Sequence, residues 1–299
     1  MKREKKKKRI RQHKLLNKPI LGTILLVLWG AVVLTSFGSG FDMVAKEHSA
    51  DYLGGGWLAA FGLLGLLIHK FHFRGEFSGN IQAKNFGMGM LLILPTMIFV
   101  VTNLLEADIS ALTPGRVLLA LAAGMGPGIM EEVTFRGLAL SNLMRVWRDE
   151  KKIVYSVSFT AALFGLIHLG NILAGAGVLV SAVQSVYAFG TGVLFAAVYV
   201  RTGNLLPCMV AHTLVDFTAF LSPELAEAGG VMADKGFEPQ MLFLAAVGLA
   251  FAALGYYYLR PAKRAEILEI WSEKWKRPAE EQFPADSGVT EKELPAEEV

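Results

Sequence analysis

Residues 117–145 read VLLALAAGMGPGIMEEVTFRGLALSNLMR. The stretch exceeds the roughly 20 apolar residues that an α-helix needs to cross the hydrocarbon core of a bilayer. It nevertheless holds Glu131, Glu132 and Arg136 in its interior. Ionisable side chains within a span cost about 2.5–3.5 kcal/mol each on insertion scales, so they face protein or water and are functional candidates. The stretch therefore predicts a membrane helix that carries a polar site.

The composition of the whole chain also indicates a membrane protein. Of its 299 residues, 53% are hydrophobic and only 18% are charged, whereas soluble domains carry about 25% charged residues. Open strands in lipid would leave backbone groups unpaired, so we predict an all-α, polytopic membrane protein of about eight transmembrane helices. The expected spans are residues 20–36, 53–69, 88–105, 117–145, 153–172, 177–200, 205–221 and 241–260. The fourth and sixth are long enough to be tilted or broken.

The distribution of lysine and arginine predicts the orientation. With the N-terminus in the cytoplasm, 25 of the 29 Lys and Arg residues fall on the cytoplasmic side, three fall outside and Arg136 lies within a span. Cytoplasmic links carry such an excess of basic residues. We therefore expect a multi-pass protein of the cell membrane with both termini in the cytoplasm.

The two ends of the chain differ in composition from the apolar region between them. Residues 1–19 are strongly basic, and beside a membrane helix they are expected to bind anionic lipid rather than nucleic acid. Residues 20–260 form the predicted transmembrane domain. Residues 278–299 are acidic and contain proline, a composition that is typical of disordered segments.

An amphipathic helix is predicted at residues 261–277. Ile267, Ile270, Trp271 and Trp275 recur at helical spacing, and Lys and Arg residues surround them. This pattern favours a helix that lies in the membrane interface, with a soluble tail helix as the alternative.

Two further spans carry polar residues at helical spacing. Phe164 and His168 are four residues apart, with Asn171 one turn further on. His212 and Asp216 are also four residues apart, so both can reach one point. A cavity shared with the fourth span is the economical way to hydrate and pair these side chains.

Within the fourth span, Glu132 and Arg136 are four residues apart and can pair. Glu131 lies about 100° around the helix from Glu132 and faces elsewhere. Pro127 either is a tolerated kink or bends the helix and opens room beside Glu131.

These residue types permit hydrolysis of a polar bond inside the bilayer. A glutamate can act as general base, and histidine can share that role or stabilise an oxyanion. No cofactor is implied with certainty, but the set Glu131, His168, His212 and Asp216 also matches zinc ligand chemistry, so a zinc-dependent route stays open. Proton and ion pathways use the same residue types, so a transporter or a non-enzymatic scaffold or immunity protein is the alternative function.

Other catalytic classes are less well matched. The sequence contains neither the HExxH motif of zinc metalloproteases nor a GxSxG nucleophile elbow. Cys208 is the single cysteine, and in its apolar surroundings it is expected to pack rather than to attack a substrate.

Three motifs together resemble the CAAX-protease and bacteriocin-processing family. They are EExxxR at residues 131–136, FxxxH at residues 164–168 and HxxxD at residues 212–216, and residues 201–204, RTGN, are similar to the lead-in of the third motif. The resemblance covers roughly residues 117–221 and implies a helical intramembrane endopeptidase that acts on a hydrophobic or lipidated peptide. Eukaryotic CAAX endopeptidases of this family remove the last three residues of prenylated proteins, but no residue here implies a prenylated substrate.

The resemblance also implies a role for each motif residue. Glu131 would be the general base that works with His168 on the attacking water, and His212 with Asp216 would stabilise the oxyanion. Supporting roles would fall to Glu132 and Arg136. The eukaryotic members carry Asn where this chain has Asp216, and an ionised carboxylate cannot donate to an oxyanion. Asp216 would then be protonated, bind a metal or, as its spacing favours, orient His212.

Overall fold

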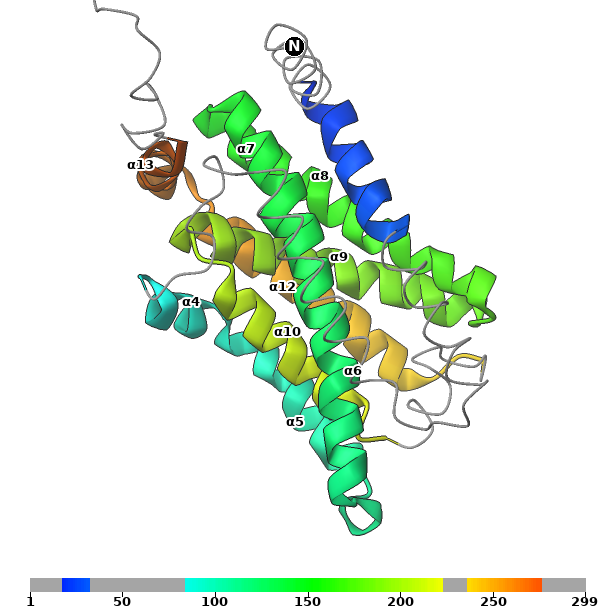
Figure 1. Ribbon diagram of the computed structural model, residues 1–299. Coiled ribbons are helices and arrows are strands. Elements are labelled where there is room, and N and C mark those ends of the chain that lie inside the picture. The colour runs from blue at the N-terminus through cyan, green and yellow to red at the C-terminus, as the bar shows by residue number, and fades with distance from the viewer. Residues whose placement is uncertain (1–17, 33–83, 223–235, 276–299) are drawn as a thin grey trace, which may run out of the picture.

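The computed structural model describes residues 18–32, 84–222 and 236–275, which form helices joined by turns and contain no strand. Figure 1 shows these helices packed into one bundle. Five helical stretches are long and apolar enough to cross a membrane. They are Phe86–Glu106, Pro114–Trp147, Glu150–Leu173, Val178–Thr202 and Pro239–Tyr258. Each coincides with a predicted span, which confirms the all-α membrane fold.

Two shorter apolar helices fall on two further predicted spans. They are Pro19–Val32 and α10, Leu206–Ala219. With 14 residues, α10 is about 21 Å long, less than the roughly 30 Å of the hydrocarbon core. The residues that precede α10, 203–205, form the turn from the preceding helix and do not extend α10. The predicted span at residues 53–69 lies outside the described residues.

Two of the spanning stretches are interrupted. The first consists of α4 (Phe86–Ile93), η1 (Leu94–Thr96) and α5 (Met97–Glu106). Its break falls at Pro95, which removes a backbone donor. The short turn η2 (Ile109–Ala111) then leads to the second interrupted stretch.

The second interrupted stretch consists of α6 (Pro114–Glu132), the π-helical segment η3 (Val133–Leu140) and α7 (Ser141–Trp147). The predicted break in span 117–145 is therefore present. It begins directly after Glu132 and not at Pro127, which lies inside the continuous helix α6. π-Helical segments inside α-helices are frequently found at functional sites. The sixth span, by contrast, is one unbroken helix, α9 (Val178–Thr202).

Close helix contacts build the bundle around α9. The most extensive contacts join α9 to α12 (Pro239–Tyr258), α9 to α8 (Glu150–Ile167), and α6 to α10. Glycines let these backbones approach, because a Cβ on Gly190 would collide with the Gly248 carbonyl of α12. On α6, Gly124 and Gly128 face the α10 backbone in the same way. The hydrophobic effect cannot drive helix association in lipid, so van der Waals packing between closely spaced helices must do so, and small residues permit that close packing.

Gly124→Ala is expected to destabilise the protein by about 1–3 kcal/mol, the usual cost of overpacking. The added Cβ would lie 2.8 Å from Phe217 Cα and 2.9 Å from the Thr213 carbonyl oxygen, both backbone atoms of α10. Gly115→Ala on the same helix is the matched control, since nothing lies within 4 Å of its Cβ. Thermal unfolding in detergent measures the difference, and equal melting of the two variants would contradict this packing.

The described chain ends with η5 (Pro261–Lys263) and α13 (Arg264–Trp275). Two residues that were predicted to face lipid, Ile267 and Trp271, are instead buried. Trp271 Nε1 donates to the Val200 carbonyl at 3.0 Å, and its ring meets Tyr199 edge-on. This part of the apolar face therefore packs on α9, where the Val200 carbonyl and the Tyr199 ring contact Trp271. The position of α13 at the membrane interface stays a prediction.

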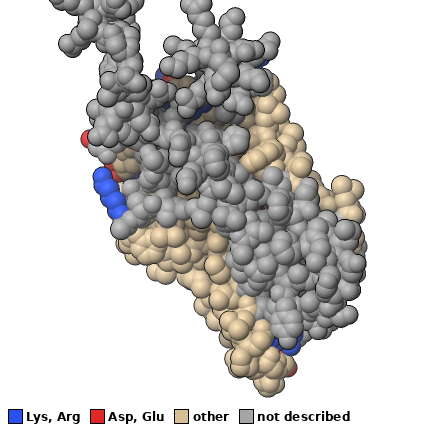
Figure 2. Space-filling model, viewed as in Figure 1, with Lys and Arg blue, Asp and Glu red and all other residues tan. Residues whose placement is uncertain are grey.

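Charged side chains are unevenly placed on the described surface. On the face that Figure 2 shows, where grey atoms do not cover it, charged residues lie toward the two ends and the surface between them is uncharged. Large apolar side chains on the outer surface of the bundle, such as Leu105, Leu118 and Leu242, are exposed. Such a band is what contact with lipid requires.

Candidate active site

A cavity of about 1170 Å³ lies inside the bundle, between α5, α6, η3, α8, α9, α10 and α12. The eight residues that the sequence singled out all line it. They are Glu131, Glu132, Arg136, Phe164, His168, Asn171, His212 and Asp216. The common cavity that was predicted from three polar helix faces is thus present, although the chemical role of each residue stays a prediction.

A buried ion pair forms the deepest part of the polar cluster. Arg136 Nη1 donates to Glu132 Oε1 at 2.8 Å, and the two side chains are 2% and 0% exposed. The Arg136 guanidinium also stacks on Phe164, 4.5 Å from the ring centroid. Its place in η3 lets Arg136 reach both partners. Breaking a buried pair of this kind by removing one member is costly, because the other charge is left uncompensated.

His212 is held by the same carboxylate. Its Nδ1 lies 2.9 Å from Glu132 Oε1, within hydrogen-bonding distance. Its ring stands edge-on to Phe164 and Phe195, at 6.3 and 5.9 Å between centroids. Glu132 from α6 is thus a partner of His212 that the spacing within one helix did not indicate, and the expected orienting role of Asp216 stays a prediction.

Two carboxylates of the cavity lie near the other imidazole nitrogen. His212 Nε2 is 3.5 Å from Asp216 Oδ2 and 3.8 Å from Glu131 Oε2. Both distances exceed the usual range for a hydrogen bond. The Glu131 and Asp216 side chains are 19% and 25% exposed, whereas Glu132 is fully buried. Of the three carboxylates around His212, Glu131 and Asp216 are thus the two that can meet a molecule in the cavity.

His168 lies where α8 ends and η4 (His168–Ala174) begins. Its Nδ1 donates to the Phe164 carbonyl at 2.7 Å, one of the carbonyls that the end of a helix leaves without a backbone partner. A neutral imidazole with its hydrogen on Nδ1 carries a lone pair on Nε2. Asn171 Nδ2 donates to Gln184 Oε1 at 2.8 Å and ties η4 to α9.

Sequence reasoning missed the cavity residues that α9 contributes. Gln184 and Tyr187 both line the cavity, yet neither carries a charge that would stand out within an apolar span. An amide inside such a span was the available signal for Gln184. Asn103 on α5 is likewise an amide within an apolar span. Its Nδ2 donates to the Val215 carbonyl and to Thr218 of α10, each at 3.1 Å.

The RTGN segment that precedes α10 shapes the turn from α9. Gly203 adopts a left-handed conformation with φ of 64°, which glycine accepts without strain. Asn204 Nδ2 donates to the Lys84 carbonyl, and its Oδ1 accepts from the backbone N–H of Leu206. Arg201 pairs with Glu266 of α13 at 3.0 Å. The segment therefore fixes the start of α10 and does not line the cavity.

Glu266 lies on α13, outside the spanning helices, and it also accepts a hydrogen bond from Lys263. The bonds from Lys263 and Arg201 hold the pKa of Glu266 below its ordinary value. Because 44% of the Glu266 side chain is exposed, solvent screens these interactions and their contribution to stability is small.

Two polar atoms in the cluster have no hydrogen-bond partner among the described residues. They are Glu132 Oε2 and Arg136 Nη2, both buried. Polar atoms of this kind are usually satisfied by water or a ligand. Within the described segments, no group of three or more His, Cys, Asp or Glu side chains is arranged to hold a metal ion. The zinc-dependent route therefore gains no geometric support here and stays untested.

Comparison with known protein families gave a match to part of the chain. Residues 113–218 match the family described as type II CAAX prenyl endopeptidase Rce1-like. The matched range covers all eight of the cavity residues that the sequence singled out. No curated protein and no solved structure matches the chain. The family match confirms the resemblance drawn from the three motifs: over residues 113–218 this membrane protein is similar to the Rce1-like CAAX proteases.

Proposed function

We propose that the protein is an intramembrane endopeptidase that hydrolyses a peptide bond within the bilayer or at its edge. One observation carries the proposal: Glu131, His168, His212 and Asp216, from three helices, line a single cavity among lipid-length helices. A peptidase needs a base, a proton carrier and donors for an oxyanion around one point. The match to a protease family supports the same reaction class.

Glu131 is the proposed general base. Its neighbour Glu132 is buried and already bonded to Arg136 and His212, whereas Glu131 is partly exposed to the cavity. The carboxylate accepts a proton from water as the water oxygen attacks the scissile carbonyl carbon. It then gives that proton to the amide nitrogen as the C–N bond breaks, which yields a new carboxyl group and a new amine.

His168 is the proposed partner of Glu131 in orienting the water. The Phe164 carbonyl accepts from Nδ1, so Nε2 can accept a hydrogen bond from the attacking water. This hydrogen bond holds the His168 ring in place. Phe164 holds it further, because the two rings meet edge-on with their centroids 4.9 Å apart. A histidine held at one nitrogen is pre-organised to act through the other.

His212 and Asp216 are proposed to stabilise the oxyanion of the tetrahedral intermediate. In the imidazolium form, His212 keeps its bond to Glu132 through Nδ1 and donates from Nε2 into the cavity. Asp216 lies beside that nitrogen, and it can donate only when it carries a proton. Loss of one oxyanion donor typically costs about 10²–10³-fold in rate.

Asp216→Asn is expected to retain activity within about tenfold of wild type, while Asp216→Ala falls by about 10²–10³-fold. The amide keeps the size of the side chain and supplies a donor, and His212 does not need Asp216 for orientation because Glu132 already binds Nδ1. Initial rates on one peptide measure both variants. Equal inactivity of Asn and Ala would mean that the reaction requires the carboxylate itself, as a metal ligand or a base.

The reaction class is tested by incubating the purified protein, reconstituted in lipid, with a library of hydrophobic and lipidated peptides. Mass spectrometry of the products is expected to show internal cleavage that persists in the presence of a chelator. Loss with chelator and recovery with zinc would replace the glutamate mechanism by a metal-dependent one. No cleavage, together with solute flux that depends on Glu131 and Asp216, would favour a transporter instead.

A further inference from the structure

Most of the basic residues of the described helices gather at one end of the bundle. The links and helix ends there are joined by direct contacts: Asn204 Nδ2 donates to the Lys84 carbonyl, and Arg201 pairs with Glu266 of α13. The link between α7 and α8 belongs to the same end, because α13 also packs against α8. We call this the basic end. Its described Lys and Arg residues are Lys84, Arg145, Arg148, Lys151, Lys152, Arg201, Arg260, Lys263 and Arg264.

The opposite end of the bundle carries the reverse charge. It comprises the end of α5, the start of α6 and the start of α12, and Gln240 joins two of these by donating to Glu106 at 2.7 Å. We call this the acidic end. Its described residues include Glu106, Asp108 and Glu238, while Arg116 is its one described cation. Because basic residues accumulate in cytoplasmic links, the charge difference places the basic end in the cytoplasm.

The cavity reaches the surface at the acidic end. Its lining includes Glu106, Ser222 and Gln240 in addition to the catalytic candidates. Glu106 and Gln240 are exposed residues. No described residue of the links at the basic end lines it. The described part of the cavity therefore extends from Glu131 toward one side of the membrane.

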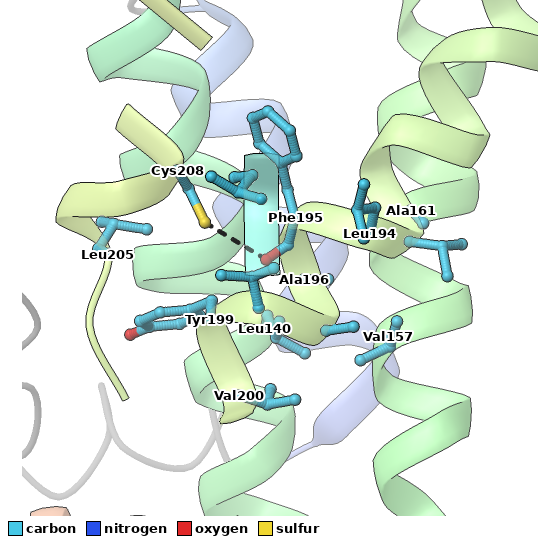
Figure 3. Close-up of a cluster of buried hydrophobic side chains, with 14 of the residues drawn as sticks. Leu140, Val157, Ala161, Leu194, Phe195, Ala196, Tyr199, Val200, Leu205 and Cys208 are labelled. Atoms are coloured by element: carbon cyan, nitrogen blue, oxygen red, sulfur yellow. Dashed lines mark hydrogen bonds between the residues drawn. The ribbon is translucent and has the colours of Figure 1, made fainter. Parts of the chain in front are cut away.

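A packed apolar cluster closes the cavity toward the basic end. Figure 3 shows Leu140, Tyr199, Leu205 and Cys208 around the backbone that follows Phe195. All four are 2% exposed or less. Cys208 Sγ lies 3.4 Å from the Phe195 carbonyl, which ties α10 to α9 at this level. Interiors packed in this way leave no room for a peptide.

We propose that the active site is entered from the extracytoplasmic side of the membrane. Its substrate, given the endopeptidase function on which this inference rests, is then a peptide segment that reaches the bilayer from outside the cytoplasm. A lipidated C-terminus displayed in the cytoplasm would meet the closed basic end. The substrate class is thus a membrane-associated peptide of the outer leaflet or an exported one.

Cysteine labelling tests the direction of entry without any need for catalysis. In a Cys208→Ser background, Ser222→Cys marks the outer rim of the cavity and Thr191→Cys marks its interior. Lys151→Cys marks the exposed basic end. Each variant is exposed to a membrane-impermeant maleimide in right-side-out and in inside-out membrane vesicles.

The two cavity cysteines are expected to react in right-side-out vesicles, with at least tenfold slower reaction in inside-out ones, and Lys151→Cys is expected to show the opposite preference. Reaction of the cavity cysteines only from inside-out vesicles would overturn the proposal. So would protection of both cavity cysteines in both kinds of vesicle when they react after denaturation. Labelling as expected in a protein that cleaves no peptide would instead overturn the endopeptidase function alone.

Discussion

Glu131→Gln is expected to lower the rate of peptide cleavage by about 10²–10⁴-fold, the contribution of a positioned general acid–base group. Glutamine keeps the size of the side chain but cannot take a proton from the attacking water. The buried ion pair involves Glu132 and Arg136 and not Glu131. The variant should therefore insert and fold normally, and the loss should fall on the chemical step.

The matched control is Glu106→Gln, which removes a carboxylate from the rim of the same cavity. Glu106 accepts a hydrogen bond from Gln240 and none from either imidazole. The cleavage rate of this variant is expected to stay within about twofold of wild type. Initial rates of both variants on one peptide, with melting temperatures measured in parallel, decide the outcome. A Glu131→Gln enzyme that keeps most of its activity would show that another group is the base.

Arg136→Met is expected to lower the stability of the protein by about 3–5 kcal/mol, the cost of leaving a buried charge without its partner. The Glu132 carboxylate is fully buried and would keep only the bond to His212. The double variant Arg136→Met with Glu132→Leu removes both charges and should recover most of the loss. It should nevertheless remain inactive, because His212 then lacks the acceptor that orients it.

Thermal or denaturant unfolding in a mild detergent measures these stabilities. Arg116→Met is the matched control, since this arginine lies in the first turn of α6 and outside the cavity. It should change the stability by about 0.5 kcal/mol or less. If the double variant were no more stable than Arg136→Met alone, the two side chains would not be coupled as the 2.8 Å contact implies.

Much of this architecture could be predicted from the sequence because lipid imposes simple rules. Long apolar stretches must be helices, and five of the predicted spans are found as such. A charge within a span must be hydrated or paired, and this rule alone singles out Glu131, Glu132 and Arg136. Spacings of four residues correctly assigned His212 and Asp216 to one helix face.

The spacing of residues within one helix could not predict the contacts between different helices. The spacing within α10 indicated Asp216 as a partner of His212, but it could not indicate Glu132 of α6, which lies 2.9 Å from Nδ1. The approach of these two helices depends on Gly124 and Gly128, whose partners no local pattern specifies. Gln184 was missed for a similar reason, since a single amide on α9 gains meaning only when Asn171 lies beside it.

The central claim is that the cavity directs a water molecule onto a peptide bond, and cleavage in water enriched in heavy oxygen tests it most directly. The wild-type protein, reconstituted in lipid, is given one peptide that it cleaves, and the mass of each product is measured. We predict one heavy oxygen atom in the newly formed carboxyl terminus of the N-terminal product, and no labelled product from Glu131→Gln. Absence of cleavage by the wild type, or products without the heavy atom, would contradict the account.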